Sequence, residues 1–497
     1  MQTTQHPITK LSFWQWQSIA AVLLLIVGPL AGILVIQAPQ VGMIGLAGIF
    51  VVLVMMNITT PTAMRGVALA VCAFIITYPM FLPRRDTGEL SVAAGGEFDA
   101  RAQIELVFVL LIAAIAFWVW LSSRRSVAIL TAPPLNQFAV YSALIVVSLS
   151  YTPDIWWAGW AALRWFEAML LLASLGVLVQ TTAQLKRMVD VVMWACALLL
   201  LAFVIDGLTG SVTYDFSARI HTTWLHPNNA SVVAFTLTSL ALTRFLTSSR
   251  WRDTLISGGL AFFGLSAGFL SGGKTGVIGS AIALVCTLAV IFYKGVQNAM
   301  LGRLLLVALG VGLAVTMFVV TNMGIVAHLE AYQTESQYLD PSNLTGRVPL
   351  WSAAMKTAME APILGHGYMS TFALPIDNGD GWISKQAHNT FVQTFFDLGL
   401  LGIVILVWIY VSVWRSCLHQ VFRGGFVDES WRLSLELFAA LIGLTINSFT
   451  EDTFSGIFEV RTMLFVLVIF AIYQNVRVSQ WRAAERKALP QPTAPEG

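Results

Sequence analysis

The sequence predicts an all-α polytopic membrane protein with about twelve to fourteen transmembrane helices. Hydrophobic residues make up 57% of the 497 residues and charged residues only 11%, and the mean hydropathy is +0.76. A soluble protein of this length could not bury so many apolar side chains. The net charge of +2 and the lack of a basic block argue against a nucleic-acid partner.

The transmembrane helices are predicted from apolar stretches of about 20 residues, the length that crosses the hydrocarbon core of a bilayer. The stretches lie at residues 18–37, 41–56, 63–82, 103–121, 135–149, 157–179, 188–206, 229–247, 254–270, 275–293, 303–321, 390–412, 434–449 and 460–476. The second, fifth and thirteenth are short, so twelve or thirteen crossings also fit. Residues 1–17 are polar and do not form a cleavable signal, so we expect the first stretch to remain as a helix.

The distribution of Lys and Arg predicts the orientation of these helices. With both termini in the cytoplasm, 18 of the 28 basic residues fall on the cytoplasmic side, as the positive-inside rule requires. The same division places residues 322–389 outside as one large loop. Within it, an apolar face over Pro349 to Glu360 predicts a short helix that could lie flat on the membrane surface.

This topology divides the chain into five regions. They are N-terminal helices at 1–134, central helices at 135–321, the large outer loop at 322–389, C-terminal helices at 390–476 and a cytoplasmic tail at 477–497.

The segment around Lys274 matches the phosphate-loop pattern GxxxxGK[ST] from Gly268 to Thr275. A phosphate loop joins a strand to a helix in a soluble α/β domain, whereas this segment follows a membrane helix, so we do not expect nucleotide hydrolysis. Its free backbone N–H groups and the lysine at a helix start can still bind an anion.

A second candidate anion site precedes the helix near residue 229. Arg219 lies just before it, Pro227 suits the first turn, and Asn228 or Asn229 is expected to cap the helix. An ordinary capped helix with an interfacial arginine explains the same pattern equally well.

The outer loop supplies further candidates at its two helix starts. Arg347 leads into the surface helix, and His388 and Asn389 precede the helix from Thr390. A histidine placed there can accept a proton from a hydroxyl, although a lone histidine at such a position is more often a cap or interface residue.

Other charged residues are expected on or near the outer face. Arg164 and Glu451 are read as substrate-binding candidates, with solvated loop residues or surface ion pairs as the alternative. Asp397 lies inside a predicted helix, where a charge is costly and needs a partner or a wet cavity. The four cysteines show no paired spacing, so neither a zinc site nor a disulfide framework is predicted.

The predicted topology places four of these residues on one face: Arg219, Lys274, Arg347 and His388. Several cations beside a neutral base suit a polyanionic substrate attacked by a hydroxyl nucleophile. The adjacent bilayer suggests that the anion is a lipid-linked phosphate or diphosphate.

Four motifs in order resemble the O-antigen ligase/polymerase family of bacterial envelopes. They are RIHTTWLHPNN, LSGGKTG, LTGRVPLWSAAMKTAMEAPILGHGY and AHNTFVQTFFDLGLLG, within roughly residues 140–475. The resemblance implies a multi-pass protein of the bacterial inner membrane that transfers glycan from an undecaprenyl diphosphate carrier on the periplasmic side, without metal or cofactor. It implies that Arg219 and Arg347 engage the diphosphate and that His388 is the base. Many ligases have Ser-Arg where this chain has Gly273 and Lys274.

Three short sequences within these motifs, at residues 274–275 (Lys-Thr), 345–347 (Thr-Gly-Arg) and 365–368 (Gly-His-Gly-Tyr), resemble those of exopolysaccharide polymerases more than those of ligases. We therefore expect polymerisation of lipid-linked repeat units, with a flippase and a chain-length regulator as partners. The alternatives are a ligase that transfers glycan to lipid A-core or protein, and a transporter or flippase with Asp397 and Asp206 as coupling residues. The glycan, its linkage and the oligomeric state are not predicted.

Overall fold

The structure, a computed structural model, is described over most of the chain after residue 60. The described residues are 61–77, 111–116, 118–119, 132–208, 222, 225–271, 274–294, 347–377, 383–423, 428–454 and 460–488. The predicted spans at 18–37, 41–56 and 303–321 lie outside these residues, as does most of 103–121.

Within the described residues the protein is almost entirely helical, as predicted. The helices are α3 (Pro61–Thr77), α6 (Leu135–Ser148), α7 (Ile155–Leu178), α8 (Thr182–Leu208), α9 (Pro227–Thr247), α10 (Trp251–Leu270), α11 (Lys274–Tyr293), α13 (Arg347–Ala358), the 3-10 helix η5 (Ser370–Phe372), α14 (Thr390–Arg423), α15 (Glu429–Ser448) and α16 (Val460–Ala488). Strands β1 (Ile376–Asp377) and β2 (Ile383–Ser384) form a small antiparallel pair. Seven described helices are long and apolar enough to cross a membrane, which makes this a multi-pass membrane protein.

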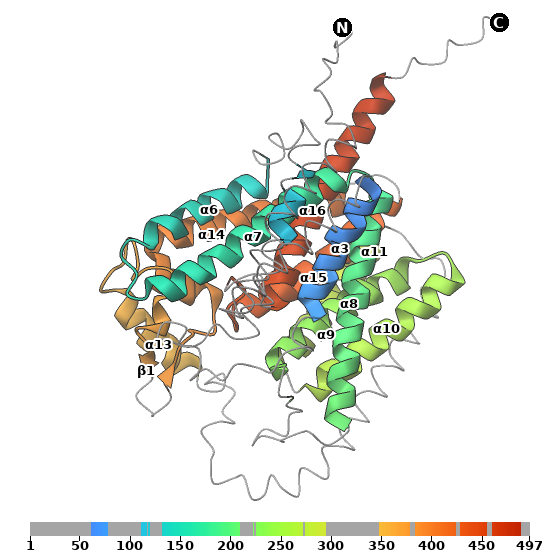
Figure 1. Ribbon diagram of the computed structural model, residues 1–497. Helices are drawn as coiled ribbons and strands as arrows, with labels where there is room; N and C mark the ends of the chain where they lie inside the picture. The colour runs from blue at the N-terminus through green and yellow to red at the C-terminus, as the bar shows by residue number, and fades with distance from the viewer. Residues whose placement is uncertain are drawn as a thin grey trace, which may run out of the picture.

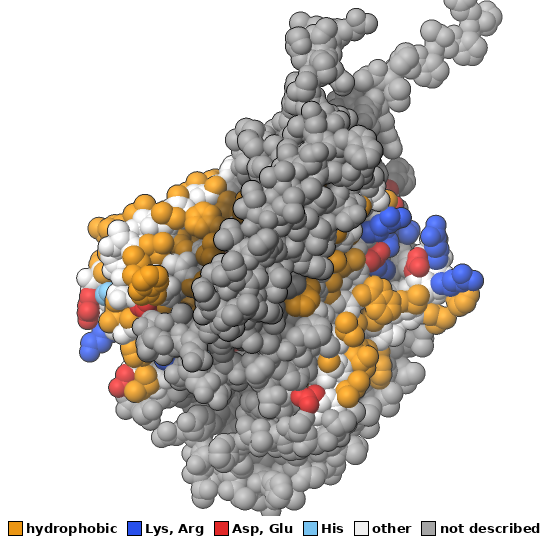
Figure 2. Space-filling view, viewed as in Figure 1, with side chains coloured by type: hydrophobic (Ala, Val, Ile, Leu, Met, Phe, Trp, Pro, Cys, Tyr) orange, Lys and Arg blue, Asp and Glu red, His pale blue; other side chains and the backbone are white. Residues whose placement is uncertain are grey.

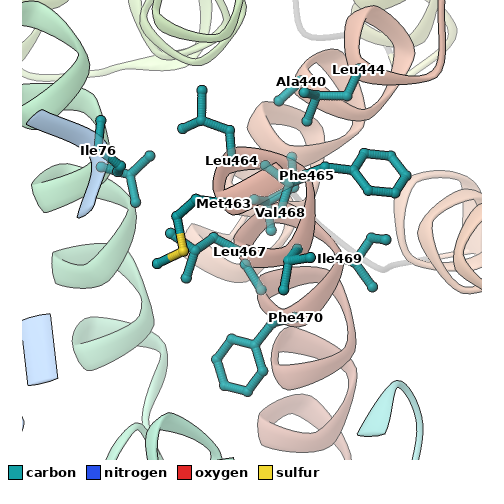
Figure 3. Close-up of a cluster of buried hydrophobic side chains, with 14 of the residues drawn as sticks. Ile76, Ala440, Leu444, Met463, Leu464, Phe465, Leu467, Val468, Ile469 and Phe470 are labelled. Carbon is teal, nitrogen blue, oxygen red and sulfur yellow. The ribbon is translucent and has the colours of Figure 1, made fainter. Parts of the chain in front are cut away.

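Helix α16 forms the centre of the bundle (Figure 1), with α6, α7 and α14 on one side and α9, α10 and α11 on the other. Figure 3 shows Met463 and Leu464 of α16 on the side of Ile76 from α3, with Ala440 and Leu444 of α15 near Phe465 on the other side. All of these side chains are buried. Because lipid is as apolar as this core, close packing must hold the helices together. An example is Gly276 of α11, where a Cβ atom would collide with Ser231 of α9.

One end of the bundle carries a partly buried ion cluster. The Arg244 guanidinium of α9 donates to both carboxylate oxygens of Glu436 on α15, at 2.9 and 2.7 Å, and to Asp190 on α8 at 2.5 Å. These three helix ends were all predicted on the cytoplasmic side, so their proximity agrees with the predicted alternation. In Figure 2, Lys and Arg gather at the edge next to the α9–α10 turn and further charges lie near α13, and hydrophobic side chains cover much of the described surface beside each edge.

The prediction for the cap of α9 is wrong. His226 is the N-cap residue, and its Nδ1 accepts a hydrogen bond from the backbone N–H of Asn228 at 3.1 Å. Pro227 occupies the first turn, as expected. Because Pro227 starts the helix itself, Asn228 and Asn229 are already inside it, and their side chains are available for other contacts.

The surface helix predicted over Pro349 to Glu360 is α13, two residues earlier at each end. Its predicted apolar face is divided. Leu350, Ala354 and Ala358 pack in a small core with Phe396 of α14 and Ile376 of β1, so this part faces the protein rather than lipid. Met355 and Met359, by contrast, are exposed.

Helix α14 is broken at Gly399, whose backbone (φ 61°, ψ −156°) is not helical. The carbonyls of Phe396 and Asp397 accept hydrogen bonds from the N–H groups of His366 and Gly367, at 2.9 and 2.8 Å. Beyond the break, the N–H of Leu400 donates to the Pro362 carbonyl at 2.9 Å. The chain segment 362–367 therefore docks into the gap, and the first nine residues of α14 form a separate short helix held by the outer loop.

Candidate active site

Glu451, in the turn between α15 and α16, is the centre of the candidate site. Its Oε1 accepts hydrogen bonds from Asn228 Nδ2 at 2.6 Å and from Arg347 Nη2 at 2.5 Å. Its Oε2 accepts from Arg461 Nη1 at 2.7 Å and contacts His388 Nδ1 at 3.1 Å. One buried carboxylate thus joins side chains from α9, α13, α16 and the start of α14.

The charges around Glu451 keep it ionised. Burial by itself would raise the pKa of this carboxyl, but His388, Arg461 and Arg347 together hold the pKa well below its usual range. The carboxylate therefore carries its charge at every physiological pH. Two arginines around a single carboxylate leave the cluster with excess positive charge, which suits an anionic ligand.

His388 is held by the first turn of α14. Asn389 caps this helix: its Oδ1 accepts from the N–H groups of Phe391 and Val392 at 2.9 and 3.1 Å, and its Nδ2 donates to the Phe449 carbonyl at 2.9 Å. His388 has a left-handed backbone (φ 48°), which is unusual outside glycine. Such a conformation persists only where its surroundings fix it.

The start of α14 is also tied to the turn that carries Glu451. The Thr390 hydroxyl donates to the Glu451 carbonyl at 3.0 Å and accepts from the N–H of Thr453 at 2.9 Å. The His388 imidazole and the Glu451 carboxylate are therefore positioned relative to each other by backbone as well as side-chain contacts.

A second polar network, around Asp397, lies further along α14. The Asp397 carboxylate is buried, and its Oδ1 accepts from the Ser370 N–H and hydroxyl at 3.1 and 3.0 Å. Its Oδ2 accepts from Gln393 Nε2 at 2.9 Å. The predicted requirement for a partner is therefore met by Ser370 and Gln393.

Four of the predicted site residues come together: Asn228, Arg347, His388 and Glu451. Arg164 instead lies over the Trp160 ring, 5.4 Å from its centroid. Arg219 and the Lys274 side chain lie outside the described residues.

Two more predicted residues have other surroundings. Asn229 is half-buried in the first turn of α9, next to Asn228. Asn389 lies next to His388, but both ends of its amide hold helix α14 and the turn at Phe449.

The sequence did not identify Arg461 as a site residue. It lies at the start of α16 and is buried, and its Nη1 donates to Glu451. An arginine ten residues after a glutamate gives no pattern of its own. The feature that could have indicated it is its position at the start of the apolar stretch 460–476, where a charged side chain is costly and therefore needs a partner.

We find no cluster of three or more His, Cys, Asp or Glu side chains suited to a metal ion within the described part of the chain. The residues gathered around Glu451 are instead hydrogen-bond donors and cations.

Comparison with known proteins relates this arrangement to a family. Residues 259–407 match the family model of the O-Antigen ligase. The resemblance inferred from the four motifs is thus confirmed over this segment. The O-antigen ligase segment contains Arg347 and His388, whereas Asn228, Glu451 and Arg461 lie outside it and join it through the contacts around Glu451.

A segment of 119 residues is 26% identical to the exopolysaccharide production protein ExoQ of Rhizobium meliloti (strain 1021). It covers 22% of this chain and 26% of that protein, so the similarity spans about a quarter of the relative's length. The family match and this relative together support a polysaccharide-related ligase or polymerase.

Proposed function

We propose that this protein polymerises oligosaccharide repeat units carried on undecaprenyl diphosphate, at the periplasmic face of the bacterial inner membrane. The observation that carries the proposal is the contact of His388 Nδ1 with Glu451, inside a cluster that also contains two arginines. Transfer of a sugar from a diphosphate-linked donor needs a base for the acceptor hydroxyl and cations for the diphosphate, and this cluster combines the two. The similarity to ExoQ, named an exopolysaccharide production protein, supports a role in polysaccharide assembly.

In the proposed reaction, Glu451 fixes the tautomer of His388. If Nδ1–H donates to the carboxylate, Nε2 carries the lone pair and can accept a proton. Nε2 removes the proton from an acceptor sugar hydroxyl as that oxygen bonds to the anomeric carbon of the donor. The bond between the anomeric carbon and the phosphate oxygen breaks, and its electron pair leaves with the diphosphate. The proton on His388 then passes to water.

The arginines provide for the negative charge of the leaving group. Arg347 uses one nitrogen on Glu451, and the other donors of its planar guanidinium can bind phosphate oxygens. We assign Arg219 and Lys274 to the same diphosphate, with Asn228, Asn229, Asn389 and Arg164 as substrate-binding residues around it. Donors fixed before the reaction stabilise developing charge without rearrangement.

The decisive test compares the glycans made by cells with wild-type protein, His388→Gln and a matched control, His419→Gln. His419 lies on the same helix and is exposed near its other end. We expect His388→Gln to reduce polymer by about 10²–10⁴-fold, the usual contribution of a general base, and to leave single repeat units. His419→Gln should retain the full ladder, and EDTA should not reduce turnover. Normal polymer from His388→Gln protein that inserts normally would refute the mechanism.

The same gel separates the two enzyme alternatives. Loss of a ligase would leave long chains on the lipid carrier, whereas loss of a polymerase leaves single repeats. Transfer to lipid A-core or protein is therefore a distinct outcome.

A transporter is the less supported alternative. Asp397, its candidate coupling residue, is engaged by Ser370 and Gln393. Transporters commonly pair interrupted helices in matching halves, and in the described residues we find one such break, at Gly399. Accumulation of unflipped lipid-linked repeats on the cytoplasmic side of a deletion strain would favour a flippase.

A further inference from the structure

Residues Asp397 and Gln393 lie on the first part of α14, the helix that follows His388, and both are buried. Gln393 Oε1 accepts from the N–H of Ala387 at 2.8 Å. Its Nε2 donates to Asp397 Oδ2 at 2.9 Å and to the Thr371 hydroxyl at 3.0 Å. A continuous chain of hydrogen bonds thus runs from Asp397 through Gln393 to the backbone N–H of Ala387, the residue directly before His388.

The chemistry of these groups allows the Gln393 amide only one orientation. The backbone N–H of Ala387 can only donate, and the Oδ2 oxygen of Asp397 is here an acceptor. The amide nitrogen must therefore face Asp397 and the amide oxygen must face Ala387. The reverse orientation would place oxygen against carboxylate and nitrogen against N–H, and would lose both bonds.

The residue that Gln393 holds, Ala387, is the direct neighbour of His388 and is fixed on both sides. The Ala387 carbonyl accepts from Trp351 Nε1 at 2.9 Å, so the residue is fixed at its N–H by α14 and at its carbonyl by α13. The next residue, His388, has the left-handed backbone. Without the Gln393 contact, one of these fixed points is lost and the backbone that directs the imidazole towards Glu451 is less constrained.

We propose that Asp397 and Gln393 are positioning residues for His388: Asp397 orients the Gln393 amide, and Gln393 fixes the backbone that directs the imidazole towards Glu451. The catalytic consequence rests on the proposed function. The structural consequence, a fixed His388, does not.

A swap of the two side-chain types tests this hydrogen-bond chain. Asp397→Asn places an NH₂ group against either the Ser370 N–H or the Gln393 amide, and Gln393→Glu places two carboxylates together. The double variant, which combines D397N with Q393E, restores every bond. In it the amide oxygen at position 397 accepts from Ser370, and the amide nitrogen donates to the carboxylate at position 393. That carboxylate accepts in turn from the Ala387 N–H and from the Thr371 hydroxyl, and the number of buried carboxylates is unchanged.

We expect each single variant to lower kcat by about 10²-fold, the usual effect of a misplaced catalytic group, with KM for the lipid-linked donor unchanged. The double variant should recover kcat to within about tenfold of wild type, because the two substitutions act on one interaction. Gln184→Glu is the matched control. The Oε1 of this glutamine accepts from the N–H groups of Gln180 and Thr181 at the start of α8, a role that a carboxylate oxygen also serves, so its replacement should leave kcat unchanged.

A readout without catalysis separates this proposal from the proposed function. In His388→Cys protein, the rate of labelling by a membrane-impermeant maleimide reports the position of residue 388. Asp397→Asn should change this rate by several-fold, and the added Gln393→Glu should restore it. If wild-type protein makes no polymer, the proposed function fails, while the labelling rates still decide the positioning.

Two results would overturn the positioning role. The first is wild-type kcat and labelling in the single variants. The second is a double variant that inserts and melts like wild type but is as inactive as Asp397→Asn, since activity would then require the aspartate itself. If Asp397→Asn does not accumulate, the double variant is compared directly with wild type on the same two measurements.

Discussion

Replacement of Glu451 by Gln should both destabilise the protein and abolish its activity. The two carboxylate oxygens serve four donors, on Asn228, Arg347, His388 and Arg461. The amide that replaces them has one acceptor oxygen, so two of the four donors would face an NH₂ group. A hydrogen bond to a charged group contributes about 1.5–3 kcal/mol, which gives a loss of about 3–6 kcal/mol. Removal of one partner from a buried ion pair costs about 3–5 kcal/mol by other measurements.

The assay is thermal melting of purified protein in detergent, combined with the glycan ladder. Asp154→Asn is the matched control, because Asp154 caps α7 through the Trp157 N–H and asparagine caps equally well. Glu451→Gln should lower Tm by several degrees and remove the ladder, while Asp154→Asn changes neither. An active Glu451→Gln protein with wild-type Tm would refute the central role of this carboxylate.

The pH dependence of the stabilisation by Glu451 follows from the direction in which its pKa is shifted. The folded pKa of Glu451 is depressed, so its contribution is complete above the unfolded carboxyl pKa of about 4.3 and is lost only as the pH falls through the lower folded value. The Tm difference between wild type and Glu451→Gln should therefore persist from neutral pH down to about pH 5. A difference that disappears within that range would contradict the depressed pKa.

Two further predictions concern stability elsewhere. Arg244→Met leaves the buried Glu436 unpaired and should cost about 3–5 kcal/mol of stability. The double variant Arg244→Met with Glu436→Leu should recover most of the lost Tm. Equal Tm values in the single and the double variant would contradict a stabilising ion pair between these two residues. Gly399→Ala should reduce both accumulation and turnover, because its Cβ would collide with the backbone at Ile363 and its φ of 61° disfavours alanine. Gly159→Ala, which has open space around it, is the control and should insert and melt normally.

Much of the fold was predictable because apolar length and the placement of Lys and Arg are properties of local sequence. The predicted span 229–247 differs from α9 by two residues at its start, and the ends predicted on one face do meet, as Arg244, Glu436 and Asp190 show. The length of α14 was underestimated, since its continuation to Arg423 mixes apolar residues with Arg415 and His419 and so does not extend the unbroken apolar stretch.

The site was predictable only in part. Arg347 and His388 were recognised from helix starts and motif sequences, and Glu451 was included only as a substrate-binding candidate. Its role as the common acceptor depends on contacts between segments more than 60 residues apart, which no local pattern contains. The cap of α9 was assigned wrongly because asparagine is the commoner cap, whereas here the residue before Pro227 performs this function.

The break in α14 has a consequence for how the outer loop can vary. Two carbonyls inside the helix, those of Phe396 and Asp397, receive their hydrogen bonds from residues 366 and 367 and not from α14 itself. A flexible linker in place of residues 362–367 would leave these carbonyls unpaired, at a cost of several kcal/mol in an apolar environment. The short helix before Gly399 would then be able to straighten, and His388 would swing away with it. This part of the loop is thus a structural member of the membrane bundle, and exchange of loops between relatives should succeed only when α14 is exchanged with it.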